Sequence, residues 1–315
     1  MRLILTILLI GLFKADAQMV INASAPYRPL GITPILDAYS NASYAYSLRK
    51  LRTAYTGAAI RVRKDTTGQP EQDIGFVNNE LDTAALKSFL NARNGFVVTW
   101  YDQSGNARNV TQATQAEQPR IANLGVIDRR SGDIAIVFDG SNDLLRNNVT
   151  GYQVNNVSHY AVSSRGNSAN TFRTVYSTGI LTSPETGFGI FYSATSAPLT
   201  QDRLYQQAQT DVAGSSINIG DYVNTLNTNN LFFGITTSSI DYSYYNGGDE
   251  KTASHTRANT LTDNRTLIGS RLNNALLTPS NYLNGTVSEL VFWQSNQSAN
   301  RTAIQNNINT YYSIY

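Results

Sequence analysis

Residues 96–106 carry side chains suited to recognising a sugar. They read Phe-Val-Val-Thr-Trp-Tyr-Asp-Gln-Ser-Gly-Asn. The first half favours a half-buried β-strand, and Ser-Gly-Asn supplies turn geometry directly after it. Aromatic rings can cover the C–H faces of a sugar, while carboxylate and amide groups can bond its hydroxyls. We therefore interpret five residues as candidate binding residues: Trp100, Tyr101, Asp102, Gln103 and Asn106.

A purely structural role would also explain the residue types of this stretch. A core strand that ends in an Asx-type turn would leave Asp102 and Asn106 bonded to backbone amides of their own turn. Successive strand side chains point to opposite faces, so only one of Trp100 and Tyr101 can serve the core. The other must face a second surface or a cleft. Both explanations stay open at the level of the sequence.

A second group of polar residues follows the apolar run of residues 134–138 (Ile-Ala-Ile-Val-Phe). Such a run predicts a buried strand, and the Asp-Gly pair that comes next is a strong turn signal. The carboxylates and the amide of this turn add three residues to the candidate binding set: Asp139, Asn142 and Asp143.

Residues 100–106 resemble the Y-D-Q-S-G-N segment in the catalytic domain of fungal-type α-L-arabinofuranosidases (arabinofuranosidase B), which is a concanavalin-like jelly roll. The resemblance extends to residues 45–49, 55–63 and 81–90, and so covers roughly residues 44–120. Residues 137–143 and 283–292 look like common laminin-G-like or concanavalin-like strands. The pattern is also similar to uncharacterised lectin-like proteins of bacteriophage particles and of secreted bacterial proteins. The resemblance implies an all-β jelly-roll sandwich, but a fold does not fix a function.

The resemblance also implies a retaining mechanism, from which this sequence departs. Such a mechanism needs two carboxylates about 5 Å apart. In the family the nucleophile is a Glu in a D-x-E-N-N strand, and the acid/base is an Asp in a late G-G-D-N segment. No D-x-E-N-N occurs here, residues 187–194 carry no carboxylate, and residues 268–273 (Ile-Gly-Ser-Arg-Leu-Asn) contain no Asp. The family's disulfide between adjacent cysteines cannot form, since the chain has no Cys. We predict no catalytic residues and no arabinofuranosidase activity.

Other carboxylates could still pair in space, which keeps an enzyme open as an alternative. Four of them lie in strands or at strand ends: Asp102, Asp139, Asp143 and Glu289. His159 and His255 lack an accompanying G-x-S-x-G elbow, and a lone strand histidine is predicted to be structural.

Composition excludes several classes of protein. Charged residues make up 15% of the chain and the net charge is +2, too little for the basic stripe of a nucleic-acid binder. The absence of Cys and the presence of only two His residues predict no disulfide, no metal site and no cofactor. The densest basic group alternates with apolar residues and predicts the solvent face of two strands. It comprises Arg49, Lys50, Arg52, Arg61, Arg63 and Lys64.

The N-terminal residues predict that the protein is exported or that it is attached to another protein. Residues 1–17 have a basic start, an apolar run too short to span a membrane and an A-x-A site, so cleavage is expected before Gln18. The alternative is an uncleaved arm that docks on another virion or surface protein. Residues 18–35 contain three prolines and are expected to be a linker or part of that arm. Residues 36–315 are expected to form one domain. The predicted location is extracellular, or the surface of a virion.

The remaining elements are predicted by their periodicity. A short helix is expected at residues 82–92, with Asp82 as N-cap and Leu86, Phe89 and Leu90 on one face. Residues 107–133 read as loop and edge structure. Short strands recur from residue 134 onward, with a hairpin at Asn246-Gly247, and predict a two-sheet sandwich. Helical spacing from about residue 299 predicts a C-terminal helix across the sandwich. This prediction is based on the spacing of Ile304, Ile308, Tyr311 and Tyr312.

Three functions remain in view. The first is non-catalytic, lectin-like binding of a glycan or polysaccharide by a surface, secreted or phage-tail protein. The second is a glycoside hydrolase acting on arabinofuranosides. The third is a purely structural jelly roll of a virion or cell surface. A carboxylate pair facing a pocket would favour the enzyme, whereas a cleft with an aromatic, amides and no such pair would favour the lectin. A flat surface without a pocket would favour the structural role.

Overall fold

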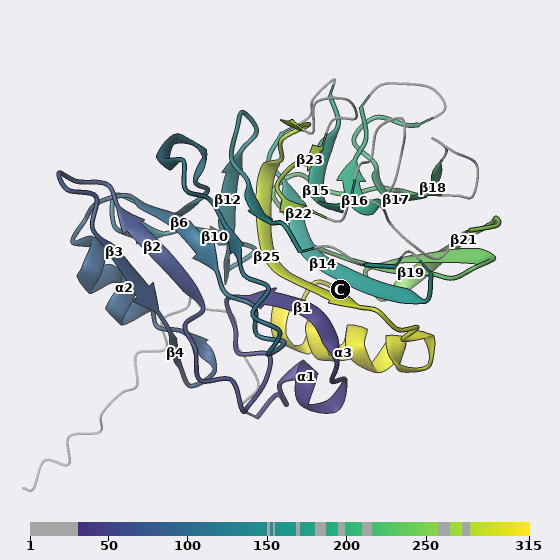
Figure 1. Ribbon diagram of the computed structural model, residues 1–315, viewed down its shortest axis with the longest axis horizontal. Coiled ribbons are helices and arrows are strands. Elements are labelled where there is room, and N and C mark those ends of the chain that lie inside the picture. Colours follow the sequence, from purple (N-terminus) through teal and green to yellow (C-terminus); the bar gives the residue numbers. More distant parts are fainter. Residues whose placement is uncertain are drawn as a thin grey trace, which may run out of the picture.

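Two antiparallel sheets packed face to face form the larger part of the molecule (Figure 1). The computed structural model describes residues 31–149, 152–153, 155–167, 171–179, 187–194, 199–209, 216–257, 265–272 and 278–315. The signal-like segment 1–17 and residues 18–30 of the predicted linker lie outside the described residues. Within the described ranges, no helix is long and apolar enough to cross a membrane.

The first sheet contains the longest strands. In spatial order these are β21 (Gly248–Ser254), β20 (Ile240–Tyr245), β19 (Asn230–Thr236), β14 (Val157–Arg165), β25 (Asn284–Trp293) and β1 (Ala42–Ser47). The predicted hairpin lies between β20 and β21, where Asn246 and Gly247 have φ values of 46° and 80°. Both residues tolerate positive φ, which the tight turn requires.

The second sheet packs against the first. Its order is β13 (Leu145–Asn147), β22 (Thr266–Ile268), β15 (Arg173–Thr178), β16 (Phe188–Tyr192), β17 (Leu204–Gln209) and β18 (Ser216–Tyr222). Aromatic rings join the two sheets. Phe292 of β25 stacks on Phe188 of β16, with ring centroids 5.2 Å apart, and on Tyr44 of β1, at 4.9 Å.

A smaller lobe extends from one end of the sandwich (Figure 1). Its strands run in the order β3 (Glu71–Ile74), β2 (Ile60–Lys64), β6 (Gly95–Trp100), β8 (Arg120–Asn123) and β12 (Ile136–Asp139). Strand β12 also pairs with β25, so hydrogen bonds continue from the lobe into the sandwich. Short pieces complete the lobe: β4 (Phe76–Val77), β5 (Glu80–Leu81), β7 (Val110–Thr111), η1 (Gln115–Glu117), β9 (Val126–Ile127), β10 (Arg129–Arg130) and β11 (Asp133–Ile134). Beside β22, β23 (Arg271–Leu272) pairs with β24 (Pro279–Ser280).

The predicted helices are present. Helix α2 (Thr83–Leu90) begins at Asp82, whose carboxylate accepts a hydrogen bond from the backbone N–H of Ala85 at 2.9 Å. Leu86 and Leu90 are buried, and Phe89 packs partly against the same cluster. Helix α3 (Arg301–Tyr312) follows the turn η2 (Ser298–Asn300).

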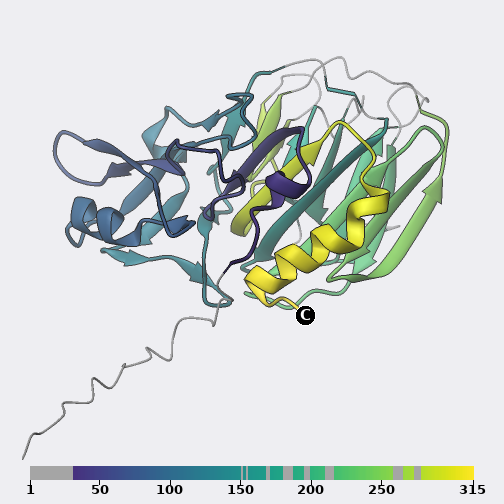
Figure 2. The same ribbon diagram turned by 90° about the horizontal axis from the view of Figure 1, so that it is seen from below.

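Helix α3 covers the outer face of the first sheet (Figure 2). With α1 (Ile35–Ala38) it buries that face, while the second sheet buries the other. All nine residues of β14 are therefore buried, and so are nine of the ten in β25. Strands covered on both faces lose the apolar–polar alternation of a half-exposed strand.

These observations confirm the predicted all-β jelly-roll sandwich with a short helix and a C-terminal helix. One hydrophobic cluster contains residues from Tyr44 to Phe292. That range supports our proposal that residues 36–315 fold as one domain. Residues 107–133, read as loop and edge structure, also contribute β8 to the lobe sheet.

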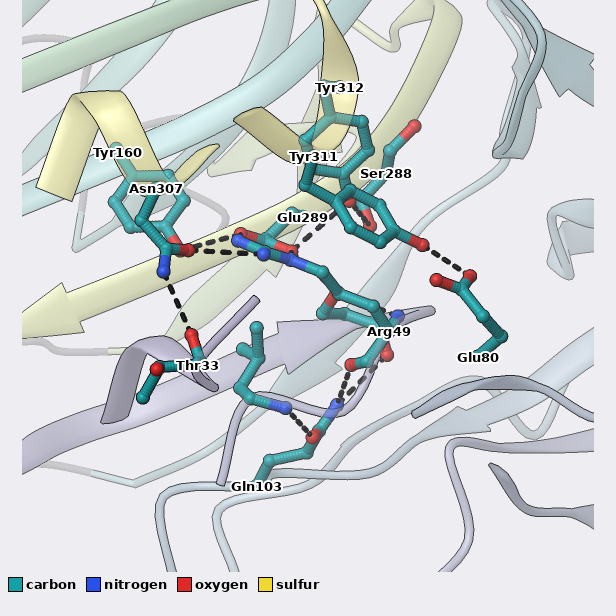
Figure 3. Close-up of polar contacts among 12 residues, drawn as sticks. Thr33, Arg49, Glu80, Gln103, Tyr160, Ser288, Glu289, Asn307, Tyr311 and Tyr312 are labelled. Carbon is teal, nitrogen blue, oxygen red and sulfur yellow. Dashed lines mark hydrogen bonds and ion pairs between the residues drawn. The ribbon is translucent and has the colours of Figure 1, made fainter. Parts of the chain in front are cut away.

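The prediction that the basic group forms a solvent face is wrong for Arg49 and Arg63, which are buried. Each finds partners inside the fold that a sequence does not reveal. The Arg49 guanidinium forms a two-point ion pair with Glu289, with N–O distances of 2.7 and 2.8 Å (Figure 3). It also donates to Asn307 of α3 at 3.1 Å.

The Glu289 carboxylate is surrounded by donors from three parts of the fold (Figure 3). It accepts hydrogen bonds from the hydroxyls of Ser47 at 2.6 Å, Tyr160 at 2.7 Å and Tyr312 at 3.1 Å. Burial alone would raise the pKa of Glu289, but Arg49 and these hydroxyls outweigh burial and hold that pKa below its ordinary value. The pair therefore stays ionised inside the protein.

We expect Arg49→Met to lower the free energy of unfolding by about 3–5 kcal/mol, because Glu289 would keep a buried charge without its cation. Urea denaturation measures the change. The matched control is Arg61→Met, because Arg61 forms the same two-point pair with Asp73 but both side chains are 43% exposed. An exposed pair contributes about 0–1 kcal/mol. Equal losses in the two variants would contradict the role given to the buried pair.

Candidate functional site

The two aromatic residues of the predicted stretch point to opposite sides of β6. Trp100 is fully buried against Tyr46, with ring centroids 5.8 Å apart. Tyr101 is partly exposed, and its hydroxyl donates to the Asp73 carboxylate at 2.7 Å. Trp100 thus serves the core, and Tyr101 is the member of the pair that reaches the surface.

The carboxylate of Asp102 is only 3% exposed and is surrounded by donors of its own fold. It accepts hydrogen bonds from the backbone N–H groups of Ala45 at 2.8 Å, Ser104 at 2.9 Å and Arg108 at 3.0 Å. The Ser104 hydroxyl adds a fourth at 2.7 Å. This carboxylate closes the turn and attaches it to strand β1.

The amides of Gln103 and Asn106 also bond to backbone. Gln103 is fully buried, accepts from the Leu51 N–H at 2.7 Å and donates to two carbonyl oxygens at 3.0 Å, those of Ser47 and Arg49 (Figure 3). Asn106 donates to the carbonyl oxygens of residues 42 and 43. The sugar-binding role predicted for this stretch stays a prediction, while its hydrogen bonds give it an architectural role. Asn106 also lines a polar hollow of about 420 Å³ near Asp37 and Arg52.

A larger cleft lies on the lobe sheet, at the opposite end of β6 from the predicted stretch. Its volume is about 520 Å³. The strand register places four of its lining residues directly opposite one another. Arg63 of β2 faces Phe96 of β6, Phe96 faces Arg120 of β8, and Arg120 faces Val137 of β12. Residues directly opposite share one face of a sheet, so this row forms the floor of the cleft.

Polar side chains surround this floor. They come from the β2–β3 hairpin, the residue before β6, the turn η1 with the residue after it, and the end of β12 with the turn that follows. The lining residues besides the row are Asp65, Gln69, Asn94, Gln115, Ala116, Gln118, Asp139 and Asp143. Two of the predicted binding residues, Asp139 and Asp143, thus lie in this cleft, whereas Asn142 is not among the residues that line it.

The buried Arg63 organises one end of the cleft. Its guanidinium donates to the side-chain oxygens of Gln118, at 2.6 Å, and Gln69, and to the Gln115 carbonyl oxygen at 3.3 Å. It also lies over the Phe96 ring, 4.7 Å from the centroid. Because its bonds are made within the fold, Arg63 holds the cleft in shape without a ligand.

Several polar groups of the cleft are left available. Within the described part of the chain, the side-chain amide of Gln115 makes no hydrogen bond. The amide nitrogens of Gln69 and Asn94 likewise donate to no described residue, because only their oxygens are engaged. Unsatisfied donors and acceptors around a concave surface are what a polyhydroxyl ligand requires.

The carboxylates of Asp139 and Asp143 lie in one short segment of the cleft wall. The backbone N–H of Asp139 donates to the Asp143 carboxylate at 2.9 Å. The Asp139 carboxylate accepts from the backbone N–H of Ser141 at 2.7 Å and closes the turn. Burial, and then the charge of Asp139, raise the pKa of Asp143 to about 7, although Arg120 acts in the opposite direction. Arg120 is itself paired with Asp128 at 2.8 and 3.0 Å.

The other titratable candidates lie in the interior. Glu289 belongs to the buried pair with Arg49. Burial lowers the pKa of His159 to about 3, so this histidine is neutral. His255 lies 3.1 Å from Asp241, which Arg257 also binds. Among the described residues, no group of three or more His, Asp or Glu could hold a metal ion.

Sequence reasoning missed most of the cleft. The sequence pattern predicts that Arg63 faces solvent, and it does not indicate Phe96, Gln115 or Gln118 as binding residues. The glutamines at 112, 115 and 118 stand three residues apart and offered a signal. The register that unites β2, β6 and β8 gave none, because strand pairing is not visible in one sequence.

We expect the contribution of Asp143 to the free energy of unfolding to fall as the pH rises from about 4 to about 7, because native Asp143 binds its proton more tightly than the unfolded chain does. Asp143→Asn removes this titration and should therefore stabilise the protein more at about pH 8 than at about pH 4. Urea denaturation across this range measures the effect. Asp139→Asn should move the change to lower pH, because it removes the neighbouring negative charge. Parallel stability curves for the native chain and Asp143→Asn would contradict the assignment.

No protein-family model matches the chain, and no curated protein matches it. Among solved structures it is similar to an arabinofuranosidase complexed with arabinofuranosyl-α-1,2-xylobiose, with 17% identity and a TM-score of 0.64. It is also similar to a Glu→Gln variant of a GH54 α-L-arabinofuranosidase soaked with 4-nitrophenyl α-L-arabinofuranoside, with 16% identity and a TM-score of 0.64. A GH54 enzyme soaked with a cyclic sulfate inhibitor gives 16% and 0.61.

Each of these comparisons covers 89% of this chain and 65% of the other. The chain thus spans about two thirds of the length of the arabinofuranosidases that it matches. At this level of identity the likeness concerns the fold. The resemblance to the catalytic domain of arabinofuranosidase B, inferred from residues 44–120, is confirmed as one of fold: this chain has an arabinofuranosidase-like jelly roll.

Proposed function

We propose that this protein binds a glycan or polysaccharide, without hydrolysing it, in the cleft on the lobe sheet. The observation that carries the proposal is the row Arg63–Phe96–Arg120–Val137, bordered by amides that make few bonds within the fold. A partly exposed aromatic ring beside fixed donors and acceptors matches the apolar and polar parts of a sugar. The arabinofuranosidase-like fold supports a saccharide as the ligand.

The cleft is held in shape before a ligand arrives. Arg63 fixes Gln69 and Gln118 by hydrogen bonds, and the Leu124 backbone N–H donates to the side-chain Oδ1 of Asn94 at 2.8 Å. Side chains that are already ordered lose little conformational freedom on binding. The cleft also favours a ligand-binding role over a purely structural jelly roll, since a structural protein needs no concave polar surface.

A glycoside hydrolase is the second candidate, and Asp143 is the observation in its favour. A carboxyl group with a pKa of about 7 can donate a proton near neutral pH, and Asp139 supplies a second carboxylate nearby. Against this candidate, both carboxylates belong to one short segment, residues 139–143, and are joined through the Asp139 N–H. Hydrolysis requires two carboxylates that flank the scissile bond. The arrangement therefore supports binding better than catalysis.

The setting that we propose is extracellular or on the surface of a virion. The polar, weakly charged composition and the signal-like residues 1–17 support it. An uncleaved N-terminus would instead attach the protein to another virion or surface protein.

Gln115→Ala should weaken glycan binding about fivefold, the equivalent of one lost hydrogen bond. It should leave the melting temperature nearly unchanged, because Gln115 is exposed and its amide makes no hydrogen bond within the described fold. A glycan array followed by titration calorimetry measures the affinity. Gln72→Ala is the matched control, since Gln72 is an exposed glutamine outside the cleft.

Gln103→Ala separates this cleft from the site first predicted. We expect it to lower the melting temperature and leave the affinity unchanged, because three buried backbone groups lose their partner at roughly 1–3 kcal/mol each. If Gln103→Ala weakens binding at constant stability while Gln115→Ala does not, the site lies at residues 100–106 and the cleft proposal is wrong.

We expect no release of 4-nitrophenol from 4-nitrophenyl α-L-arabinofuranoside above the uncatalysed rate, because the segment 139–143 does not place carboxylates on two sides of a sugar. A colorimetric assay from about pH 4 to about pH 8 covers both charge states of Asp143. Turnover that disappears in both Asp139→Asn and Asp143→Asn would instead establish the hydrolase.

A further inference from the structure

A second hollow is lined in part by Phe76 of β4 and is separate from the cleft on the lobe sheet; Figure 1 shows where β4 lies in the lobe. Its volume is about 310 Å³. The residues that line it are Lys50, Tyr55, Thr56, Gly57, Ala58, Gly75 and Phe76. None of them lines the first cleft, and they bring together two aromatic rings, one cation and no carboxylate.

The two rings form a corner. Tyr55 and Phe76 have ring centroids 6.3 Å apart and planes at 77°. The Tyr55 hydroxyl donates to the Ala58 carbonyl oxygen at 2.8 Å, which fixes the ring. Burial, and then the charge of Asp102, raise the pKa of Tyr55 to about 12, so the phenol stays neutral. Gly57 makes room for this ring, because a Cβ atom there would lie 2.6 Å from the Tyr55 hydroxyl oxygen.

The tight turn between β4 and β5 presents Phe76. Asn78 and Asn79 have φ values of 52° and 65°, a conformation that asparagine tolerates. The Asn79 carbonyl oxygen accepts from the Lys50 backbone N–H at 2.8 Å, which places Lys50 beside the hairpin. Hydrogen bonds to backbone carbonyl oxygens thus hold Tyr55 on one side of the hollow and the β4–β5 hairpin on the other.

The hollow is positively charged. Lys50 is the charged residue in its lining, and within the described ranges its ammonium forms no ion pair. The two carboxylates whose charges act on Tyr55 are already bound by other partners. Asp73 is bound by Arg61 at 2.8 Å through both oxygens, and Asp102 is surrounded by N–H donors. An anionic ligand in this hollow would therefore meet the Lys50 cation in a lining that contains no carboxylate.

We propose that this corner, formed by Lys50, Tyr55 and Phe76, binds a uronic acid residue of an acidic polysaccharide. The apolar face of the sugar ring would pack on the aromatic corner, and the Lys50 ammonium would pair with the sugar carboxylate. The Thr56 hydroxyl and the backbone of residues 57 and 58 would meet the ring hydroxyls. This site is independent of the glycan cleft and holds whether or not that cleft binds a sugar.

The experiment is titration calorimetry of the full chain with trigalacturonate, with galactotriose as the neutral counterpart and benzoate as an aromatic carboxylate that is not a sugar. We expect trigalacturonate to bind and galactotriose to bind at least about tenfold more weakly, because it lacks the charge-assisted bond to Lys50. Lys50→Gln should reduce the affinity for trigalacturonate about tenfold. Lys87→Gln is the matched control, since Lys87 is an exposed lysine of α2 on the same lobe.

Gly57→Ala tests the aromatic corner without removing a ring. It should displace Tyr55 and weaken binding severalfold, with Lys50 intact. Gln72→Ala, at an exposed residue outside both the cleft and the hollow, should leave trigalacturonate binding unchanged. The proposal is overturned if trigalacturonate does not bind the native chain at millimolar concentration, if Lys50→Gln and Lys87→Gln behave alike, or if benzoate binds as tightly as trigalacturonate.

Discussion

The ion pair between Arg49 and Glu289 joins parts of the chain that are 240 residues apart. Glu289 lies in the strand that pairs with β1, β12 and β14, and its carboxylate also holds a tyrosine of α3. Arg49 stacks under Tyr311, with its guanidinium carbon 4.5 Å from the ring centroid. Two buried charges are tolerated only when every neighbouring polar group is satisfied. The position of α3 on the sheet, and with it the burial of the outer face of β25, depends on this arrangement.

The same network reaches the turn of residues 102–106. Gln103 donates to the carbonyl oxygen of Arg49, and Asp102 accepts from the backbone of β1. The segment whose sequence resembles Y-D-Q-S-G-N therefore forms a structural joint between the lobe and the sandwich. The polar groups most available to a ligand lie elsewhere, on a sheet row that no short motif identifies. The residues that resemble the family's segment form the joint. The residues of the candidate site are brought together by the pairing of strands that lie far apart in the sequence.

Local features of the fold were predictable from the sequence. Asp82 begins a helix because its carboxylate can cap the first turn, and Asn246-Gly247 turns a hairpin because both residues tolerate positive φ. The partners of Arg49 and Arg63 were not predictable, since a basic residue between apolar ones reads as exposed unless its buried acceptors are known. Asp139 and Asp143 are candidate binding residues because they lie in the turn that follows an apolar strand. Their meeting with Phe96 in one cleft depends on β12 pairing with β8, a contact between distant parts of the lobe.

The pairing of β1 with β25 has a consequence for synthesis of the protein. Strand β1 emerges from the ribosome well before its partner, residues 289–293, because Ser47 and Glu289 are 242 residues apart in the chain. Until then β1 lacks the strand that joins it to the first sheet, and Arg49 lacks the Glu289 carboxylate. Contacts between residues so far apart in the chain slow folding and prolong the exposure of unpaired strand edges. The first sheet can therefore form only after β25 has been synthesised, and the strands that pair with it must remain soluble until then.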